Sequence, residues 1–136
     1  MKKTFRLDIY TPYEHYFSAN AEYLSLSSEK FTLGILPNHG EMISTVAICE
    51  ITIQKNGEQT HYATSGGIIK VKDNQVDLLL QTIESETEID LERAEKARER
   101  AENRLLHTVK ETISETNARL ALERAINRIN IKKRKE

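Results

Sequence analysis

Residues 51–64 of the chain read ITIQKNGEQTHYAT. The pair Asn56-Gly57 in the middle of this stretch is the strongest short signal for a β-hairpin, because both residue types tolerate a positive φ. Before the pair, Ile51 and Ile53 alternate with polar residues, as they do in a strand that buries one face. The stretch therefore predicts two antiparallel strands joined by a tight turn, with residues 60–64 returning beside residues 48–53.

Similar short runs of alternating or β-rich sequence occur on both sides of this hairpin, and turn residues separate them. Pro12 and Pro37 end two runs, Gly66-Gly67 interrupts the chain before a third, and Asp73-Asn74 forms another tight turn. Many short strands without helical periodicity are typical of an antiparallel sandwich or barrel. We expect this domain to span residues 1–86, with further strands at residues 5–9, 31–35, 68–71 and 76–83.

The sequence changes character after this domain, because no Gly or Pro occurs from Ile89 onward. Small and apolar residues recur there at spacings of three and four, which places them on one face of a helix. Between two such stripes, Thr108 with Glu111 and Thr112 with Glu115 match the capping-box pattern of a helix start. We therefore predict an α+β chain in which residues 87–136 form an antiparallel two-helix hairpin. Its stripes contain Ala94, Ala97, Ala101 and Leu105, then Ala118, Leu122, Ala125, Ile126 and Ile129.

The predicted hairpin buries little apolar surface, because its stripes are rich in alanine. At about 0.8 kcal/mol for each buried methyl group, the alanines at positions 94, 97, 101, 118, 121 and 125 contribute only about 5 kcal/mol, and conformational entropy opposes most of that. The linking segment also lacks Gly and Pro, so nothing in it forbids a continuous helix. The hairpin is therefore either a two-state element or a static pair of helices packed on the sandwich.

The composition indicates a small protein without a membrane-spanning segment. The chain has 136 residues, of which 38% are hydrophobic. No run approaches the roughly 20 apolar residues that span a bilayer, and we expect no signal peptide. The single Cys49 excludes an intramolecular disulfide. It lies in an apolar, strand-like run, so we expect a buried, inert thiol, which fits a reducing cytoplasm.

The charges are unevenly distributed, although the net charge is only −1. Residues 1–88 contain 7 Lys/Arg and 12 Asp/Glu, whereas residues 89–136 contain 13 Lys/Arg and 9 Asp/Glu. The net charge argues against a nucleic-acid partner. The second half is either a basic arm that meets an acidic surface or a solvated helical face.

The sequence offers no catalytic constellation. Its histidines are too scattered for a metal site by spacing. Ser65-Gly66-Gly67 lacks the preceding glycine and the strand–turn–helix context of a nucleophile elbow, and Cys49 has no activating neighbour. We therefore expect neither a metal site nor enzymatic activity. The histidines are His15, His39, His61 and His107.

Three segments, taken in order, resemble the ε-subunit family of bacterial F-type ATP synthases. They are Gly34-Ile35-Leu36-Pro37-Asn38-His39, then Ser65-Gly66-Gly67 with the strand and the Asp73-Asn74 turn that follow, and Asp90-Leu91-Glu92-Arg93-Ala94. The resemblance covers essentially the whole chain, and its specificity lies in the ordered combination of the segments. The chain departs from the family after His39, where Gly40-Glu41 stands in place of a frequent Pro-Leu.

This resemblance implies a non-catalytic rotor subunit of the central stalk, which couples ion translocation to ATP synthesis. The sandwich would bind the γ subunit and the c-ring. The helices would either fold against the sandwich or extend beside γ toward the α and β subunits, where they would inhibit ATP hydrolysis. The implied location is the cytoplasmic face of the bacterial cell membrane, reached only through the complex. The isolated chain would be a monomer.

The resemblance also implies a regulatory ATP site on the hairpin, with no other cofactor required. Guanidinium groups would pair with phosphate oxygens, while an acidic group would accept hydrogen bonds from the adenine amine or the ribose. Without a Gly-rich phosphate loop, affinity would depend on side chains alone. The alternative interpretation of these residues is a helix cap with surface ion pairs. The matching residues are Glu84, Asp90, Arg93, Ala94, Arg124 and Arg128.

Two sets of subunit contacts follow from the same resemblance. Loops of the sandwich would meet the c-ring and γ through Glu29, Leu36, Pro37, Asn38, His39 and Glu41. Basic residues of the hairpin would meet acidic segments of the β subunits through Arg98, Arg100, Arg104, Arg124 and Arg128, with the tail Lys132-Lys133-Arg134-Lys135. In the simpler interpretation, the loop residues only form turns and the basic residues only keep the protein soluble.

Two other functions fit the same sequence. A generic β-sandwich binding module with a helical oligomerisation hairpin would form a stable homo-oligomer and ignore γ. A nucleotide-binding sensor outside any synthase would bind ATP without affecting synthase activity.

Overall fold

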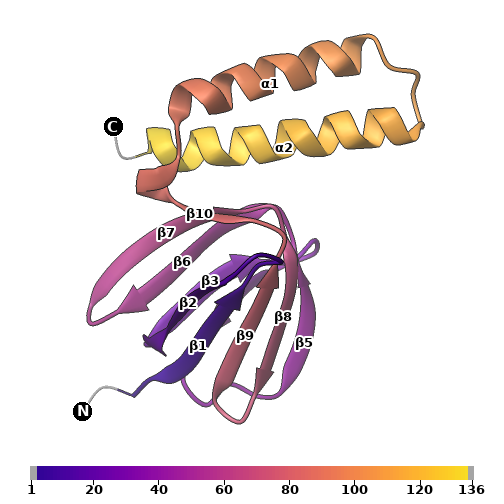
Figure 1. Ribbon diagram of the computed structural model, residues 1–136. Coiled ribbons are helices and arrows are strands. Elements are labelled where there is room, and N and C mark those ends of the chain that lie inside the picture. Colours follow the sequence, from indigo (N-terminus) through magenta and orange to yellow (C-terminus); the bar gives the residue numbers. More distant parts are fainter. Residues whose placement is uncertain (1–2, 135–136) are drawn as a thin grey trace. The chain divides into compact units, whose positions relative to one another are not determined.

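The computed structural model describes residues 3–134, which form ten strands, one short 3₁₀ helix and two α-helices (Figure 1). The chain divides into two compact units, with the boundary between Ser85 and Glu86. The first unit is a β-sandwich and the second is a helical hairpin, which confirms the predicted α+β class. Within the described residues, no helix has the length and apolar character needed to span a membrane.

The sandwich consists of two five-stranded sheets. The first sheet has the order β2 (His15–Ala21), β1 (Phe5–Tyr10), β9 (Gln75–Leu80), β8 (Gly67–Lys72) and β5 (Met42–Val46). The second has the order β10 (Ile83–Ser85), β7 (Glu58–Thr64), β6 (Cys49–Lys55), β3 (Tyr23–Ser27) and β4 (Thr32–Ile35). Neighbouring strands are antiparallel except β1 and β9, which are parallel. Parallel strands need a long connection between them, and the chain supplies one because it forms strands of both sheets between β1 and β9.

Apolar side chains from alternate positions of the strands fill the space between the sheets. Leu7 of β1, Ile51 of β6 and Leu78 of β9 are fully buried in this core. Cys49 lies in the same core, and its burial raises the pKa of the thiol. The expectation that this cysteine is buried is therefore confirmed.

Both predicted tight turns are present. Asn56 and Gly57 have φ values of 53° and 77°, and they join Lys55 and Glu58, which face each other at the ends of β6 and β7. Asp73 and Asn74, between β8 and β9, have φ values of 51° and 61°. Two consecutive positive φ values match the right-handed twist of the flanking strands, so these turns set the register of both hairpins.

The predicted last strand, residues 76–83, is in fact two strands in different sheets. β9 ends at Leu80, and β10 begins at Ile83 on the other side of the sandwich. The crossing is held by Thr64, whose hydroxyl donates to the Thr82 carbonyl at 2.7 Å. Gln81 and Thr82 form the crossing, and because neither is Gly or Pro, no turn signal in the sequence locates it.

The helical unit comprises η1 (Glu86–Glu88), α1 (Leu91–Leu106) and α2 (Ile113–Lys133). Asp90 caps α1 and Thr112 caps α2, each accepting a hydrogen bond from a backbone N–H three residues later. The two helices pack through alanines, with exposed fractions of 3%, 2%, 0% and 0% for Ala94, Ala101, Ala118 and Ala125. These four residues are called the alanine seam below. Ile126, which the predicted stripe included, is 39% exposed and lies outside the seam.

The turn between α1 and α2 has a defined conformation although it contains neither Gly nor Pro. Glu111 adopts a φ of 64°. Its backbone N–H donates to the Glu115 carboxylate, and the Thr108 hydroxyl donates to the Arg104 carbonyl. Of the two predicted capping boxes, only the one at Thr112 starts a helix, because Thr108 follows the end of α1.

A polar network surrounds Asp8 of β1, which is only 8% exposed. Its carboxylate accepts hydrogen bonds from Ser18 Oγ and Gln75 Nε2, both at 2.7 Å, and lies 2.9 Å from His15 Nε2. Desolvation alone would raise the pKa of this carboxyl. The hydrogen bonds from Ser18, Gln75 and His15, with the charge of Arg6, outweigh that effect and lower the pKa from 3.8 to about 2.

We expect the sandwich to lose stability as the pH falls from about 4 to about 2. The pKa of Asp8 is lower in the folded protein than in the unfolded chain, so ionised Asp8 stabilises the fold at pH values above about 4. Protonation of Asp8 between about pH 4 and pH 2 removes this stabilisation. Asp8→Asn should lack this component of the pH dependence. Urea unfolding midpoints across the acid range measure the effect. A constant difference between wild type and variant over that range would contradict it.

Gly67 should tolerate no side chain. A Cβ at this position would lie 2.0 Å from the Leu79 carbonyl oxygen, whereas a Cβ at Gly40 would meet nothing within 4 Å. We expect Gly67→Ala to destabilise the sandwich by about 1–3 kcal/mol, since the clash is with backbone, and Gly40→Ala to have little effect. Urea unfolding of both variants provides the comparison, and equal midpoints would show that the β8–β9 contact is not close.

Candidate functional site

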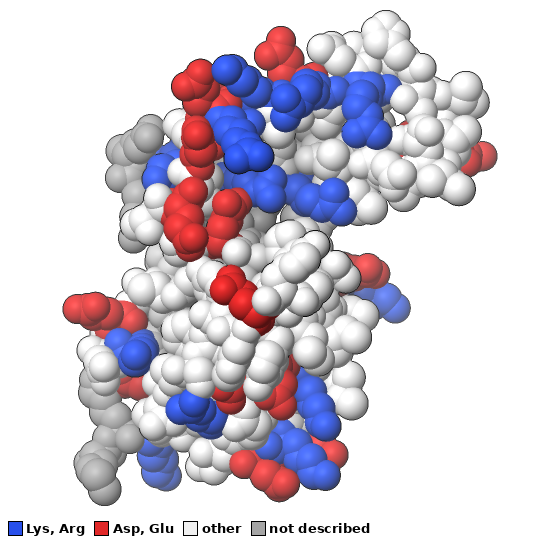
Figure 2. Space-filling view, in the orientation of Figure 1, with Lys and Arg blue, Asp and Glu red and all other residues white. Residues whose placement is uncertain are grey.

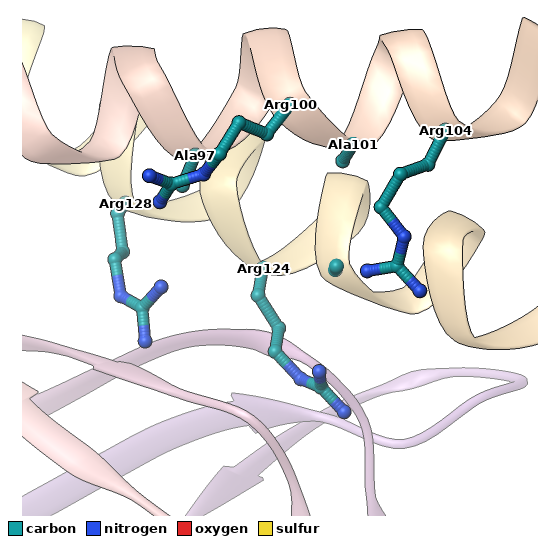
Figure 3. A pocket seen from close by; sticks show the side chains of 7 residues that line it. Ala97, Arg100, Ala101, Arg104, Arg124 and Arg128 are labelled. Atoms are coloured by element: carbon teal, nitrogen blue, oxygen red, sulfur yellow. The ribbon is translucent and has the colours of Figure 1, made fainter.

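The clearest candidate site is an open groove of about 380 Å³ on the helical hairpin. Arg100 and Arg104 of α1 and Arg124 and Arg128 of α2 line it (Figure 3). A spacing of four residues on each helix brings both members of a pair to one helical face. The remaining lining residues are Ala97, Ala101 and Ala121, whose small side chains leave the space between the guanidinium groups open.

The groove collects the positive charge of four arginines. None of its lining residues is acidic, and within residues 3–134 neither Arg100, Arg104 nor Arg124 forms an ion pair. By contrast, Arg98 on the same α1 helix pairs with Glu102 at 3.2 Å. Figure 2 shows Lys and Arg side chains gathered over the hairpin. Guanidinium groups donate paired hydrogen bonds to phosphate or carboxylate oxygens, so this arrangement suits an anion with several oxygens.

A second hollow of about 390 Å³ adjoins the groove, since Arg100 lines both. Its other lining residues are Asp90, Glu92, Arg93 and Lys96. The charges here are mixed, and Lys96 pairs with Glu92 at 3.2 Å. Asp90 accepts the Arg93 backbone N–H at 3.1 Å, so the cap that was the alternative interpretation of Asp90 is present. An exposed carboxylate keeps further acceptor capacity beyond this one bond.

Some of the residues expected to bind a nucleotide line the groove or the hollow, and the others belong to other parts of the chain. Arg124 and Arg128 line the groove, while Asp90 and Arg93 line the hollow beside it. Ala94 is in the alanine seam, where a small side chain lets the helices approach. Glu84 belongs to β10 of the sandwich, where it faces Ala63 of β7, and not to the helical unit.

The basic tail is engaged within the helical unit itself. Lys132 Nζ donates to the Glu86 carbonyl at 3.2 Å, and Lys133 Nζ lies 3.4 Å from Glu95 Oε1. Lysines in the last turn of a helix also interact favourably with its dipole. Lys135, the last basic residue of the expected contact set, lies outside the described residues.

The loop residues expected to contact other subunits fall into two groups. Glu29 precedes β4, whereas residues 36–41 follow it, so a whole strand separates them. Leu36 is 59% exposed. Asn38 has a φ of 62°, and its backbone N–H donates to the Asn74 side chain at 2.8 Å, which joins this loop to the β8–β9 turn. Pro37, His39 and Glu41 lie in the same loop.

The sequence analysis missed an exposed apolar row on the outer side of the first sheet. Ile68 of β8 and Leu79 of β9 face each other and are 46% and 52% exposed. Ile43 of the neighbouring β5 is 71% exposed. The available signal is the loss of alternation in Ile68-Ile69 and in residues 78–80, which is typical of a strand with apolar residues on both faces. A surface of this kind indicates an interaction site.

Two family models match the chain in succession. The model described as ATP synthase, Delta/Epsilon chain, beta-sandwich domain matches residues 4–86. The model described as ATP synthase, Delta/Epsilon chain, long alpha-helix domain matches residues 87–133. Together they account for nearly the whole length.

Curated relatives agree with this match, and solved structures share the fold. An ATP synthase epsilon chain from Desulfitobacterium hafniense is 42% identical over 130 residues, which is 96% of this chain and 97% of the relative. The ATP synthase epsilon chain from Bacillus licheniformis is 38% identical over 95% of this chain and 98% of the relative. The fold resembles a chain in the mitochondrial ATP synthase of Euglena gracilis, with a TM-score of 0.77 and 21% identity over 88% of this chain and 76% of that one. It also resembles a chain in the mitochondrial ATP synthase of Tetrahymena thermophila, with a TM-score of 0.65 and 13% identity over 99% of this chain and 98% of that one.

Proposed function

The chain belongs to the delta/epsilon chain family of ATP synthases, and on this premise we propose that it is a non-catalytic subunit of the central stalk of a bacterial synthase. The observation that carries this proposal is the continuous match of both units to one family. Its role is to couple ion translocation to ATP synthesis and to restrain ATP hydrolysis.

The proposed partners of the sandwich are the γ subunit and the c-ring. The apolar row of Ile43, Ile68 and Leu79 is a surface that the sandwich leaves open to solvent and that a partner protein would cover. We assign this row to γ, and the loop residues named above to γ or the c-ring. The chain then reaches the cytoplasmic face of the membrane through the complex, as a peripheral subunit.

The proposed partners of the hairpin are the α and β subunits. Arg100, Arg104 and Arg124 carry guanidinium groups without ion-pair partners in the part of the chain that the structure describes. Acidic segments of β would pair with them when the helices extend beside γ, and this contact would hinder rotation in the hydrolysis direction. Arg98 and Arg128 belong to the same contact set.

The groove and the adjoining hollow together support regulatory binding of ATP. The arginines of the groove would hold the phosphates, and Asp90 in the hollow would accept hydrogen bonds from the base or the ribose. Because the groove contains residues of both helices, a bound nucleotide would bridge them and stabilise the folded hairpin. Bound ATP would then oppose the inhibitory, extended form.

Removal of the hairpin should increase ATP hydrolysis by the assembled synthase head several-fold. The comparison uses the intact chain and a chain truncated after Ser85, because the core of the sandwich lies before this point. If both the intact and the truncated chain bind γ and the rates of ATP hydrolysis are equal, the chain is a stalk subunit but its hairpin is not inhibitory. If neither form binds γ, the stalk assignment itself is wrong.

ATP should stabilise the isolated chain against thermal unfolding, by about 2.7 kcal/mol when its concentration is a hundred times the Kd. Replacing Arg124 and Arg128 together by Ala should remove this effect, because both line the groove. Arg98→Ala is the matched control, since Arg98 pairs with Glu102 and does not line the groove. Thermal unfolding that is unchanged in millimolar ATP would reject the nucleotide site.

The two alternative functions predict different behaviour. An oligomerisation hairpin would make the purified chain a stable homo-oligomer, whereas the stalk subunit is a monomer that binds γ. A free nucleotide sensor would respond to ATP and leave synthase activity unchanged. Sedimentation of the chain with and without γ separates these possibilities.

A further inference from the structure

One asparagine side chain joins separate segments at one end of the sandwich. Asn74 lies in the β8–β9 turn, where its φ of 61° is one that Asn tolerates. Its side-chain Oδ1 accepts the backbone N–H of Asn38 at 2.8 Å, and its Nδ2 donates to the Thr4 carbonyl at 2.9 Å. Its own carbonyl accepts the Arg6 N–H at 3.1 Å. Asn74 therefore binds the β4–β5 loop and the segment that enters β1 to the same turn.

The loop that Asn74 holds is restricted in two further ways. Leu36-Pro37-Asn38-His39 follows β4, with Pro37 and Asn38 at the centre of a turn. Proline fixes its own φ at about −65°. The next residue, Asn38, has a φ of 62°, and proline followed by a positive φ is the pattern of a type II turn. The ring of Pro37, the conformation of Asn38 and the bond to Asn74 thus restrict the same turn.

The Leu36–His39 turn combines this restriction with exposure to solvent. Leu36 is 59% exposed, and no Lys, Arg, Asp or Glu occurs in residues 31–40. Connecting loops are usually the mobile parts of a domain, whereas a loop that is already ordered loses less conformational entropy when it binds. A restricted turn with an exposed apolar side chain and no charge is therefore preorganised for contact with an uncharged surface of a partner.

The position of this turn at the ends of strands separates it from the surface assigned to γ. The apolar row of Ile43, Ile68 and Leu79 lies on the outer side of the first sheet. The Leu36–His39 turn follows the end of β4 in the second sheet, and it is bonded to the turn after β8. A second partner can therefore reach the turn while γ covers the row.

We propose that Asn74 is a positioning residue that holds the Leu36–His39 turn in the conformation in which the sandwich docks on the c-ring. Asn74 acts through the Asn38 backbone and need not touch the ring itself. Without the Asn74 side chain the turn would populate other conformations, and the apparent affinity for the ring would fall with the fraction of competent turns. The proposal rests on the proposed contact of this loop with the c-ring, and it names the residue on which that contact depends.

Two glycine variants in one turn test whether the Asn74 side chain holds the loop. Asn74 and Asp73 both have a positive φ, which glycine adopts freely, and the Asp73 side chain makes no hydrogen bond or ion pair within residues 3–134. Only Asn74→Gly removes the acceptor for the Asn38 N–H. Hydrogen exchange of this amide in the full chain should be about 2- to 10-fold faster in Asn74→Gly than in Asp73→Gly. Equal exchange rates in the two variants overturn the proposal.

Asn74→Asp is the conservative variant. It keeps the Oδ1 acceptor for the Asn38 N–H and loses only the Nδ2 donor to the Thr4 carbonyl. The slow exchange of the Asn38 amide should therefore be retained. Exchange as fast as in Asn74→Gly would show that Oδ1 does not hold the loop.

Docking is measured by titrating the complex of γ and the full chain with vesicles that carry c-rings. Asn74→Gly should weaken docking by about the same factor as it accelerates exchange, and Asp73→Gly should not. Leu36→Ser, at an exposed position, should weaken docking and leave the exchange of the Asn38 amide unchanged. In the double variant of Asn74 and Leu36 the loss should be smaller than the product of the single losses, because both act through one turn. A loss equal to that product would overturn the positioning role.

The two single variants distinguish a wrong positioning role from a wrong c-ring contact. If Leu36→Ser weakens docking while Asn74→Gly accelerates exchange without weakening docking, the c-ring contact stands and the positioning role is wrong. If neither variant changes docking, the turn does not contact the c-ring, and the proposed contact is wrong together with the positioning role.

Discussion

The close approach of α1 and α2 across the alanine seam is the contact on which the rest of the helical unit depends. Ala94 and Ala101 of α1 and Ala118 and Ala125 of α2 are buried, and each side chain is a single methyl group. Small side chains leave room above the seam, and the longer arginines on either side therefore enclose a groove. The same small side chains bury little area, so the packing that forms the groove contributes little free energy to holding the two helices together. A stronger apolar interface would fill the groove and hold the helices together.

Much of the fold could be predicted from the sequence, because alternation, turn residues and alanine periodicity are local signals. Asn56-Gly57 and Asp73-Asn74 form the expected turns, and both helices occur where the periodicity places them. The parallel pairing of β1 with β9 and the crossing from β9 to β10 depend on contacts between distant residues, which local patterns do not report. β2 (His15–Ala21), which no local signal predicted, pairs with β1 and packs Tyr16, Phe17 and Ala21 against the core.

The candidate site was less predictable than the fold. The spacing of Arg124 and Arg128 indicates a shared helical face, and they line one groove. Arg100 and Arg104 complete this groove because of the register in which α1 packs on α2. The sequence of either helix alone does not specify this register. Similarly, Glu29 and the loop after β4 are neighbours in sequence, yet the strand between them separates them in space. The exposed Ile68 and Leu79 could have been noticed, because their apolar neighbours break the alternation expected of a solvated sheet face.

The lysines at the end of α2 have a consequence for ionic strength. Lys132 and Lys133 are bound to Glu86 and Glu95 while the hairpin is closed, and the same lysines belong to the tail that would meet acidic segments of a partner. For these two lysines, opening would exchange one set of attractions for another, whereas Arg100, Arg104 and Arg124 would gain acidic partners that they lack in the closed hairpin. Salt screens both sets, so the two effects oppose each other in the overall equilibrium. The contribution of Lys132 and Lys133 to opening would therefore depend little on salt concentration, whereas the contribution of the three arginines would weaken as salt increases.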